Sequence, residues 1–167
     1  MDLARFWRHV RMHPIRERRA FPRRTLDAIQ REVAAQERRH RGQVVFVVEA
    51  ELSSTQLWHG LSPRERARQV FAARGVWNTE ENNGVLIYLL LADRSVEVVA
   101  DRGVDARVGD AEWQEICRAM ERHFRAGEFE AGSIAGVRAV SVLLARHFPA
   151  QAGSVRANEL PDRPQLL

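Results

Sequence analysis

The feature that most constrains this fold is a pair of short, almost uninterrupted apolar runs. The first is QVVFVVEA over residues 43–50, and the second is GVLIYLLL over residues 84–91. A membrane-spanning helix needs about 20 apolar residues, so both runs are too short to be one. Runs of this length, rich in valine and leucine and without polar alternation, are typical of strands buried on both faces of a sheet. We therefore predict a central sheet with helices on both sides.

A third strand is predicted over residues 95–101, directly after the short turn at residues 92–95. Because this turn is tight, the strand should pair with strand 84–91 as an antiparallel hairpin. The connection between the first two strands is long and contains a helical segment, so these strands should be parallel. The sequence therefore predicts the α/β class with a small mixed sheet.

Amphipathic periodicity predicts five helices, over residues 2–12, 25–40, 63–74, 110–126 and 133–148. Ser62 and Glu65 form a capping box before the third of these, and Thr25 and Asp110 are expected to cap the second and fourth. Residues 16–24 are expected to form a basic connection. The chain then divides into a basic amphipathic segment (1–21), one α/β/α domain (22–148) and an extended tail (149–167).

Composition excludes several classes of protein. The chain has 167 residues and a formal net charge of +4, and it carries one cysteine, which excludes an internal disulfide and a cysteine-rich zinc site. No segment matches a signal peptide or a transmembrane helix. These features predict a cytoplasmic protein, with peripheral membrane attachment as an added option.

Positive charge is concentrated at the N-terminus. Residues 1–41 hold 12 arginines and 5 acidic residues, whereas the remaining chain has a small acidic excess. Residues 1–24 have three interpretations: they pack on the domain or on a protein partner, they lie on an anionic membrane surface, or they bind nucleic acid. The last is the least favoured, because the segment has no aromatic stacking pattern and no known nucleic-acid motif.

The predicted topology gathers oxygen-bearing side chains at one end of the sheet, where strand 84–91 begins and strand 95–101 ends. Carboxylate and amide oxygens are ligands that Ca²⁺ and Mg²⁺ prefer, so a divalent cation site is one hypothesis. The alternative is that these residues only form turns and pair with Arg102 and Arg107. The candidate ligands are Asn82, Asn83, Asp101 and Asp105, with Glu81 and Asp110 as further members.

Several short motifs, in order and at matching spacing, resemble the TPM domain family. They are Asn82-Asn83-Gly84-Val85-Leu86-Ile87, Asp93-Arg94, Val96-Glu97-Val98-Val99, Gly103-Val104 and Phe124-Arg125-Ala126-Gly127. The resemblance covers roughly residues 25–148 and implies a Rossmann-like α/β/α sandwich. The family includes thylakoid-lumen acid-phosphatase proteins of photosystem II repair and many bacterial envelope proteins. This chain resembles its short, anchorless bacterial type.

The resemblance also implies that Ca²⁺ or Mg²⁺ can bind in an acidic cleft, and phosphatase activity has been proposed for some members. One departure is that Asp101 stands where the family usually has glycine. Histidine, serine and cysteine do not occur at a telling spacing near the cluster, and no organic cofactor motif is present. We therefore expect a non-catalytic binding or accessory domain that acts with a membrane-associated or multi-protein partner. The alternative is a metal-dependent phosphatase.

Overall fold

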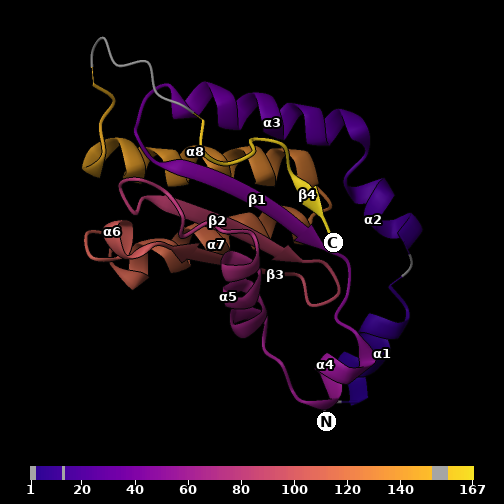
Figure 1. The fold of residues 1–167 in the computed structure, drawn as a ribbon. Helices are drawn as coiled ribbons and strands as arrows, with labels where there is room; N and C mark the ends of the chain where they lie inside the picture. Colours follow the sequence, from indigo (N-terminus) through magenta and orange to yellow (C-terminus); the bar gives the residue numbers. More distant parts are fainter. Residues whose placement is uncertain (1–2, 13, 152–157) are drawn as a thin grey trace.

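The computed structural model describes residues 3–12, 14–151 and 158–167, and it shows an open mixed sheet between layers of helices (Figure 1). Two parts of the sequence-based predictions lie outside the described residues. They are the start of the first helix at residue 2 and the stretch 152–157 of the tail.

The sheet has the strand order β3-β2-β1-β4. Strand β1 (Gln43–Glu49) pairs in parallel with β2 (Gly84–Leu90), and β2 pairs in antiparallel fashion with β3 (Ser95–Ala100). The short strand β4 (Gln165–Leu166) lies parallel to β1 on its other side. The mixed sheet and the hairpin are therefore as predicted, because the tight turn and the long connection fix the two strand directions.

Both central strands are buried along their whole length, which explains their uninterrupted apolar sequences. Successive side chains point to opposite faces, so each strand contributes to two cores. On β1, Val44 and Phe46 belong to one core cluster, and Val45 and Val47 belong to the other.

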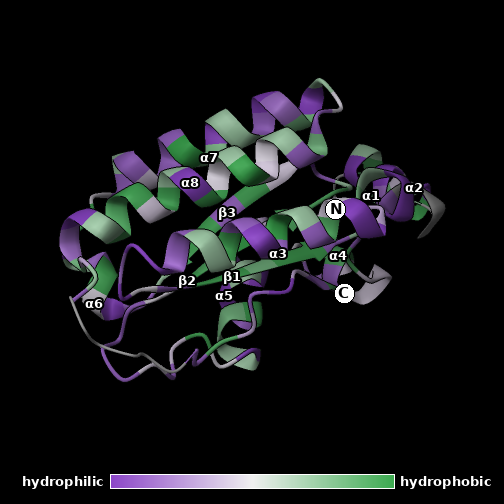
Figure 2. Ribbon diagram, turned by 90° about the horizontal axis from the view of Figure 1, so that it is seen from above, coloured by the Kyte–Doolittle hydropathy of each residue, from purple (hydrophilic) through white to green (hydrophobic). Residues whose placement is uncertain are grey.

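Helices cover both faces of the sheet (Figure 2). One face carries α3 (Arg23–Glu37), α7 (Asp110–Arg125) and α8 (Phe129–His147), and α7 and α8 also pack on each other. The other face carries α5 (Pro63–Ala73) and the short α4 (Ser54–Trp58). This arrangement is the predicted α/β/α sandwich.

Two predicted helix caps are wrong. Pro22 precedes α3 at the capping position, and Thr25 instead lies inside the helix, where its hydroxyl donates to Glu130 Oε2 at 2.7 Å. Gly109 is the capping residue of α7, and Asp110 is the first helical residue. A polar residue near the start of a helix can occupy either the capping position or the first turn, since an acidic residue in the first turn also interacts favourably with the helix dipole. The capping box at Ser62 and Glu65 is present as predicted.

Four short elements were not predicted as separate helices or strands. The basic connection contains α2 (Pro14–Ala20), α6 (Arg102–Asp105) follows β3, and the predicted extended tail contributes β4. The short α4 has its own capping box at Ser53 and Gln56. These elements are too short to show a hydrophobic period, and proline at residue 14 suits the first turn of a helix as well as the end of one. The first residue of α8 is Phe129, four residues before the predicted start.

The helices of the described residues include none that combines the length and the apolar character needed to cross a membrane.

Gly84 is the tightest point at the start of β2, because a Cβ added there would overlap the backbone carbonyl oxygen of Val76. We predict that Gly84→Ala lowers the free energy of unfolding by about 1–3 kcal/mol, as overpacking does when the neighbour cannot move aside. Urea denaturation followed by circular dichroism measures this change. Gly109→Ala is the matched control, since nothing lies within 4 Å of its added Cβ. Equal stability of the two variants would contradict the prediction.

Candidate functional site

The hairpin brings together the loops that hold the predicted cation ligands. The Asp101 backbone N–H donates to the Gly84 carbonyl at 2.8 Å, and the Gly103 N–H donates to the Asn82 carbonyl at 3.0 Å. Asp101 Oδ1 accepts from the Arg102 N–H at 2.7 Å and so caps α6. The polarity of β2 and β3 therefore places Asn82, Asn83 and Asp101 at the same end of the sheet.

Arginines engage two of the candidate ligands. Arg102 Nε donates to Asn82 Oδ1 at 2.9 Å, and Arg41 Nη1 lies 2.7 Å from Glu81 Oε1. Contacts of this kind are what the alternative interpretation of the cluster expects, namely that its polar residues pair with arginines of the same chain. Asp105 and Asp110 are exposed at the end of α6 and at the start of α7.

Two buried oxygens in these loops have no hydrogen-bond partner among the described residues, namely Asn83 Oδ1 and Asp101 Oδ2. Asn83 is fully buried, and its amide nitrogen donates to the Arg41 carbonyl at 2.8 Å. Unpartnered buried oxygens are uncommon and point to an unseen donor or cation. Within the described part of the chain, however, no three His, Cys, Asp or Glu side chains are grouped as metal ligands would be.

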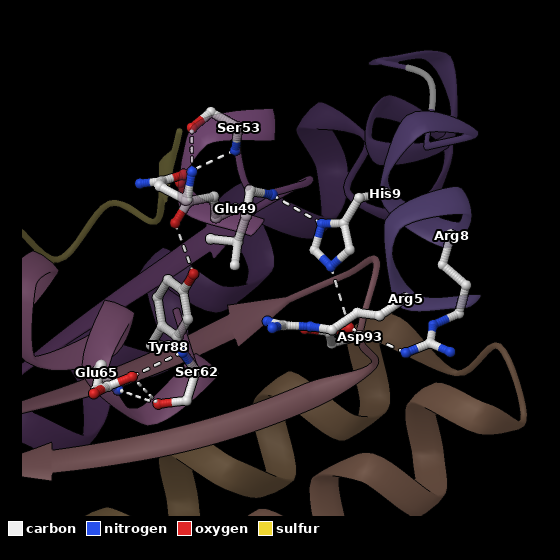
Figure 3. Close-up of polar contacts among 11 residues, drawn as sticks. Arg5, Arg8, His9, Glu49, Ser53, Ser62, Glu65, Tyr88 and Asp93 are labelled. Atoms are coloured by element: carbon white, nitrogen blue, oxygen red, sulfur yellow. Dashed lines mark hydrogen bonds and ion pairs between the residues drawn. The ribbon is translucent and has the colours of Figure 1, made fainter. Parts of the chain in front are cut away.

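The opposite end of the sheet holds a buried polar network that the sequence analysis did not predict (Figure 3). His9 of α1 (Leu3–Val10) is 1% exposed; its Nδ1 accepts from the Leu52 N–H at 2.9 Å, and its Nε2 lies 3.1 Å from Asp93 Oδ1. The Leu52 N–H requires Nδ1 to be the accepting ring nitrogen, so Nε2 is the nitrogen that faces the Asp93 carboxylate.

Two arginines of the same helix complete the network around Asp93. Arg5 Nη2 lies 2.8 Å from Asp93 Oδ2, and Arg8 Nη2 lies 3.4 Å from Asp93 Oδ1. Burial alone would raise the pKa of Asp93, but the close contacts of His9 and Arg5 and the positive charge of Arg5 outweigh it and hold that pKa well below its ordinary value. The turn after β2 thus fastens the N-terminal helix to the sheet.

Within the predicted helix 2–12, the apolar residues Leu3, Phe6, Trp7 and Val10 fall on one stripe, and α1 does not turn this whole stripe inward. Phe6 is partly buried against the core on the α5 face of the sheet. The other three point outward, with exposed fractions of 63% for Leu3, 56% for Trp7 and 52% for Val10. We call these three side chains the α1 stripe. The inward side of α1 carries the polar His9, and a pattern of apolar residues cannot identify a polar residue as the one that packs.

A second charged group, Glu49 at the end of β1, is buried nearby and fully paired. Tyr88 Oη donates to Glu49 Oε2 at 2.6 Å, and Arg66 Nε and Nη2 donate to the same carboxylate at 2.9 and 2.8 Å. Burial and then the Glu49 carboxylate raise the pKa of Tyr88 far above its ordinary value. The hydrogen bond to Glu49 likewise raises the pKa of Arg66. Tyr88 and Arg66 therefore keep fixed protonation states near neutrality, and their contacts with Glu49 stabilise the join between β1 and α5.

Replacing Asp93 should loosen α1. We predict that Asp93→Asn costs about 2 kcal/mol of stability at neutral pH, since it removes charge-assisted hydrogen bonds from a buried site. It should also increase amide hydrogen exchange over residues 4–10. Asp105→Asn, at an exposed aspartate, is the matched control.

The cost of Asp93→Asn should depend on pH in one direction. The folded-state pKa of Asp93 is lower than its ordinary value of 3.8, so its contribution is present above that value and is lost as the pH falls through the folded pKa. The stability difference between wild type and variant should therefore be largest at pH 6–7 and shrink below pH 4. A difference that stays constant down to pH 2 would contradict this assignment.

Comparison with known proteins supports the family resemblance. The model of the TPM domain family matches residues 16–143. The NMR structure of the BA42 protein from the psychrophilic bacterium Bizionia argentinensis is similar at 26% identity, with a TM-score of 0.71, and the match covers 86% of this chain and 92% of that one.

Two further structures share the fold. The N-terminal domain of a P. gingivalis protein is 23% identical with a TM-score of 0.59, covering 77% of this chain and 81% of that chain. The N-terminal domain of the cg2496 protein from Corynebacterium glutamicum is 15% identical with a TM-score of 0.55, covering 82% and 80% respectively. A search of the curated proteins gave no match. Because the family model spans more than half of the sequence and the topology agrees, the chain belongs to the TPM domain family.

Proposed function

We propose that this chain is a non-catalytic accessory domain that binds the surface of an anionic membrane through α1. The observation that carries the proposal is the α1 stripe. Its three large apolar side chains point outward, while the opposite side of the helix is held to the sheet through Asp93. A helix that packs only to fill the core would turn these residues inward.

The charge around the α1 stripe favours a lipid surface. Arg8 has a half-exposed side chain, and the Arg11 guanidinium lies 6.0 Å from the centre of the Trp7 ring. Tryptophan is enriched at membrane–water interfaces, and each basic residue near an anionic surface contributes about 1 kcal/mol. Trp58 on α4 is 71% exposed, and this helix follows Leu52, whose backbone binds His9. Figure 1 shows α4 beside α1, so Trp58 offers a second exposed aromatic side chain on a neighbouring helix.

The anchoring network supports this role because it fixes α1 before any contact with lipid. An amphipathic helix that folds only on binding must offset its own ordering entropy. Here Asp93, Arg5 and His9 already hold the helix against the turn after β2. The outward side chains are therefore preorganised.

Vesicle sedimentation tests the proposal. We expect the protein to sediment with vesicles of phosphatidylglycerol and phosphatidylcholine at low salt, and to remain in solution with pure phosphatidylcholine or in 0.5 M NaCl. Leu3→Ser combined with Trp7→Ser should lower the bound fraction at least ten-fold, since it removes two apolar groups that enter the interface.

The matched control for vesicle binding is Trp77→Ser combined with Val142→Ser. Both residues are 54% exposed and lie outside α1. Equal loss of binding in the two double variants, or equal binding of the protein to neutral vesicles, would overturn the membrane proposal. Binding to a protein surface would then be the remaining interpretation of the stripe.

We also propose that the loops at the opposite end of the sheet bind Ca²⁺ or Mg²⁺ weakly. The support is the pair of unpartnered oxygens, Asn83 Oδ1 and Asp101 Oδ2. Such hard oxygen donors suit these ions. Asn82 would join the site only if Arg102 released it, and Asp105 would have to reach back from α6. A site so poorly preorganised should bind in the high-micromolar to millimolar range.

Calorimetric titration with Ca²⁺ and Mg²⁺ measures this affinity. Asp101→Asn keeps an acceptor for the Arg102 N–H while removing the negative charge, so we expect binding at least ten-fold weaker than in the wild type. Asp27→Asn on α3 is the control. Absence of a signal at millimolar ion concentration, or unchanged binding in Asp101→Asn, would show that the loops are capped turns.

A metal-dependent phosphatase is the alternative function, and it would use the same two loops. The one cysteine does not add a nucleophile, because burial raises the pKa of Cys117 to about 11 and keeps the thiol protonated near neutrality. Phosphomonoesterase activity that requires Mg²⁺, Ca²⁺ or Mn²⁺, and that Asp101→Asn abolishes, would overturn the non-catalytic proposal.

A further inference from the structure

A cavity of about 440 Å³ lies where α2, the turn after β2 and the connection from α7 to α8 meet. Its volume falls within the range of small-molecule sites, about 300–1,000 Å³. Figure 2 shows α2 at the same end of the molecule as the connection from α7 to α8. The apolar part of the lining comes from Met12, Ala20, Leu89, Leu91, Phe124 and Phe129.

The aromatic wall of this cavity is fixed. The rings of Phe124 and Phe129 stack with centroids 5.6 Å apart, and Phe129 also meets Phe21 edge-on at 5.6 Å. Leu89 is fully buried in β2, and Phe124 is 4% exposed. These two buried side chains hold the floor rigid, and the half-buried Met12, Ala20 and Phe129 offer its accessible apolar surface.

Three arginines complete the lining: Arg19 of α2, Arg94 of the turn and Arg125 of α7. All three are exposed residues. Arg125 donates to Glu121 at 2.9 Å, whereas the guanidinium groups of Arg19 and Arg94 have no hydrogen bond or ion pair with any described residue. Positive charge beside an apolar floor is complementary to a ligand with an apolar body and an anionic head.

The backbone at Arg94 is unusual for a residue with a side chain. Its φ of 53° lies in the left-handed region, which costs a non-glycine residue about 1 kcal/mol or more. Gly127, across the cavity, also has a positive φ of 80°. Strained backbone at a non-glycine residue is over-represented where a ligand is held, and Arg94 is such a residue, whereas the positive φ of Gly127 is the ordinary ending of α7.

The backbone N–H and C=O groups at the floor of the cavity already form hydrogen bonds within the protein, which argues against a bound peptide. Leu89 belongs to a strand paired on both sides. The Leu91 N–H donates to the Glu49 carbonyl at 3.0 Å, and the Leu91 carbonyl accepts from the Arg94 N–H at 3.1 Å. An extended peptide would find no free backbone groups at Leu89 or Leu91, whereas an alkyl or aryl chain needs none.

We infer that this cavity binds a monomeric anionic amphiphile, with its hydrocarbon tail against the Phe124–Phe129 wall and its carboxylate or phosphate head at Arg19 and Arg94. The site is separate from the α1 stripe and does not depend on the proposed membrane binding. It gives the turn after β2 a second role: Asp93 fastens α1, and the next residue offers its charge to a ligand.

Calorimetry with decanoate below its micelle concentration tests the inference. We expect saturable one-to-one binding, at least ten-fold weaker binding of decyl glucoside, and no detectable binding of acetate. Arg19→Gln combined with Arg94→Gln should weaken decanoate binding at least ten-fold. Ala20→Phe, which fills the cavity from α2, should abolish it while the thermal transition shows a folded protein.

Arg118→Gln combined with Arg122→Gln is the matched control, because it removes the same charge from α7 away from this cavity. Decanoate binding should survive in this control and in the Leu3→Ser, Trp7→Ser variant, so failure here is distinguishable from failure of membrane binding. The inference is wrong if the control loses binding equally, if a folded Ala20→Phe binds normally, or if acetate binds as well as decanoate. Tighter binding of a short peptide ending in Leu-Phe would reassign the site to a peptide carboxyl terminus.

Discussion

Complete burial of two adjacent strands is the constraint from which the rest of this structure follows. Every residue of β1 and β2 is buried, so both faces of the sheet must be covered and both strands must find neighbours. The hairpin supplies β3 on one side, and the distant C-terminal segment supplies β4 on the other. The helices then form two layers because each strand sends side chains to both faces.

Burial of the strands also requires that the acidic residues where β1 and β2 end be paired with hydrogen-bond donors. Glu49 and Asp93 both follow buried apolar runs and are themselves largely removed from water. An unpaired carboxylate there would be costly, so each is surrounded by donors from a helix: Arg66 for Glu49, and Arg5 with His9 for Asp93. The same electrostatic requirement fastens α5 and α1 to the sheet, and fixing α1 leaves its apolar stripe outward.

The two ends of the sheet consequently differ in chemistry. Amide and carboxylate oxygens gather where β2 begins, and two of them, on Asn83 and Asp101, are buried without a partner. Where β2 ends, arginines border both the α1 stripe and the cavity beside Arg94. The proposed cation binding at one end and the proposed amphiphile or membrane binding at the other therefore involve separate residues of one small domain.

Strands β1, β2 and β3, their directions and the meeting of Asn82, Asn83 and Asp101 could be predicted from the sequence, because apolar runs, a tight turn and a long crossover are local signals with one topological solution. The orientation of α1 could not be. Its apolar residues fall on one stripe, which could pack on the domain, pack on a partner or face a membrane. Leu3, Trp7 and Val10 lie outward, because His9 gains two partners, Leu52 and Asp93, that are distant in the sequence. Hydrophobic periodicity reports which residues share a helix face, whereas the face that packs is chosen by hydrogen bonds and charges that exist only after the chain has folded.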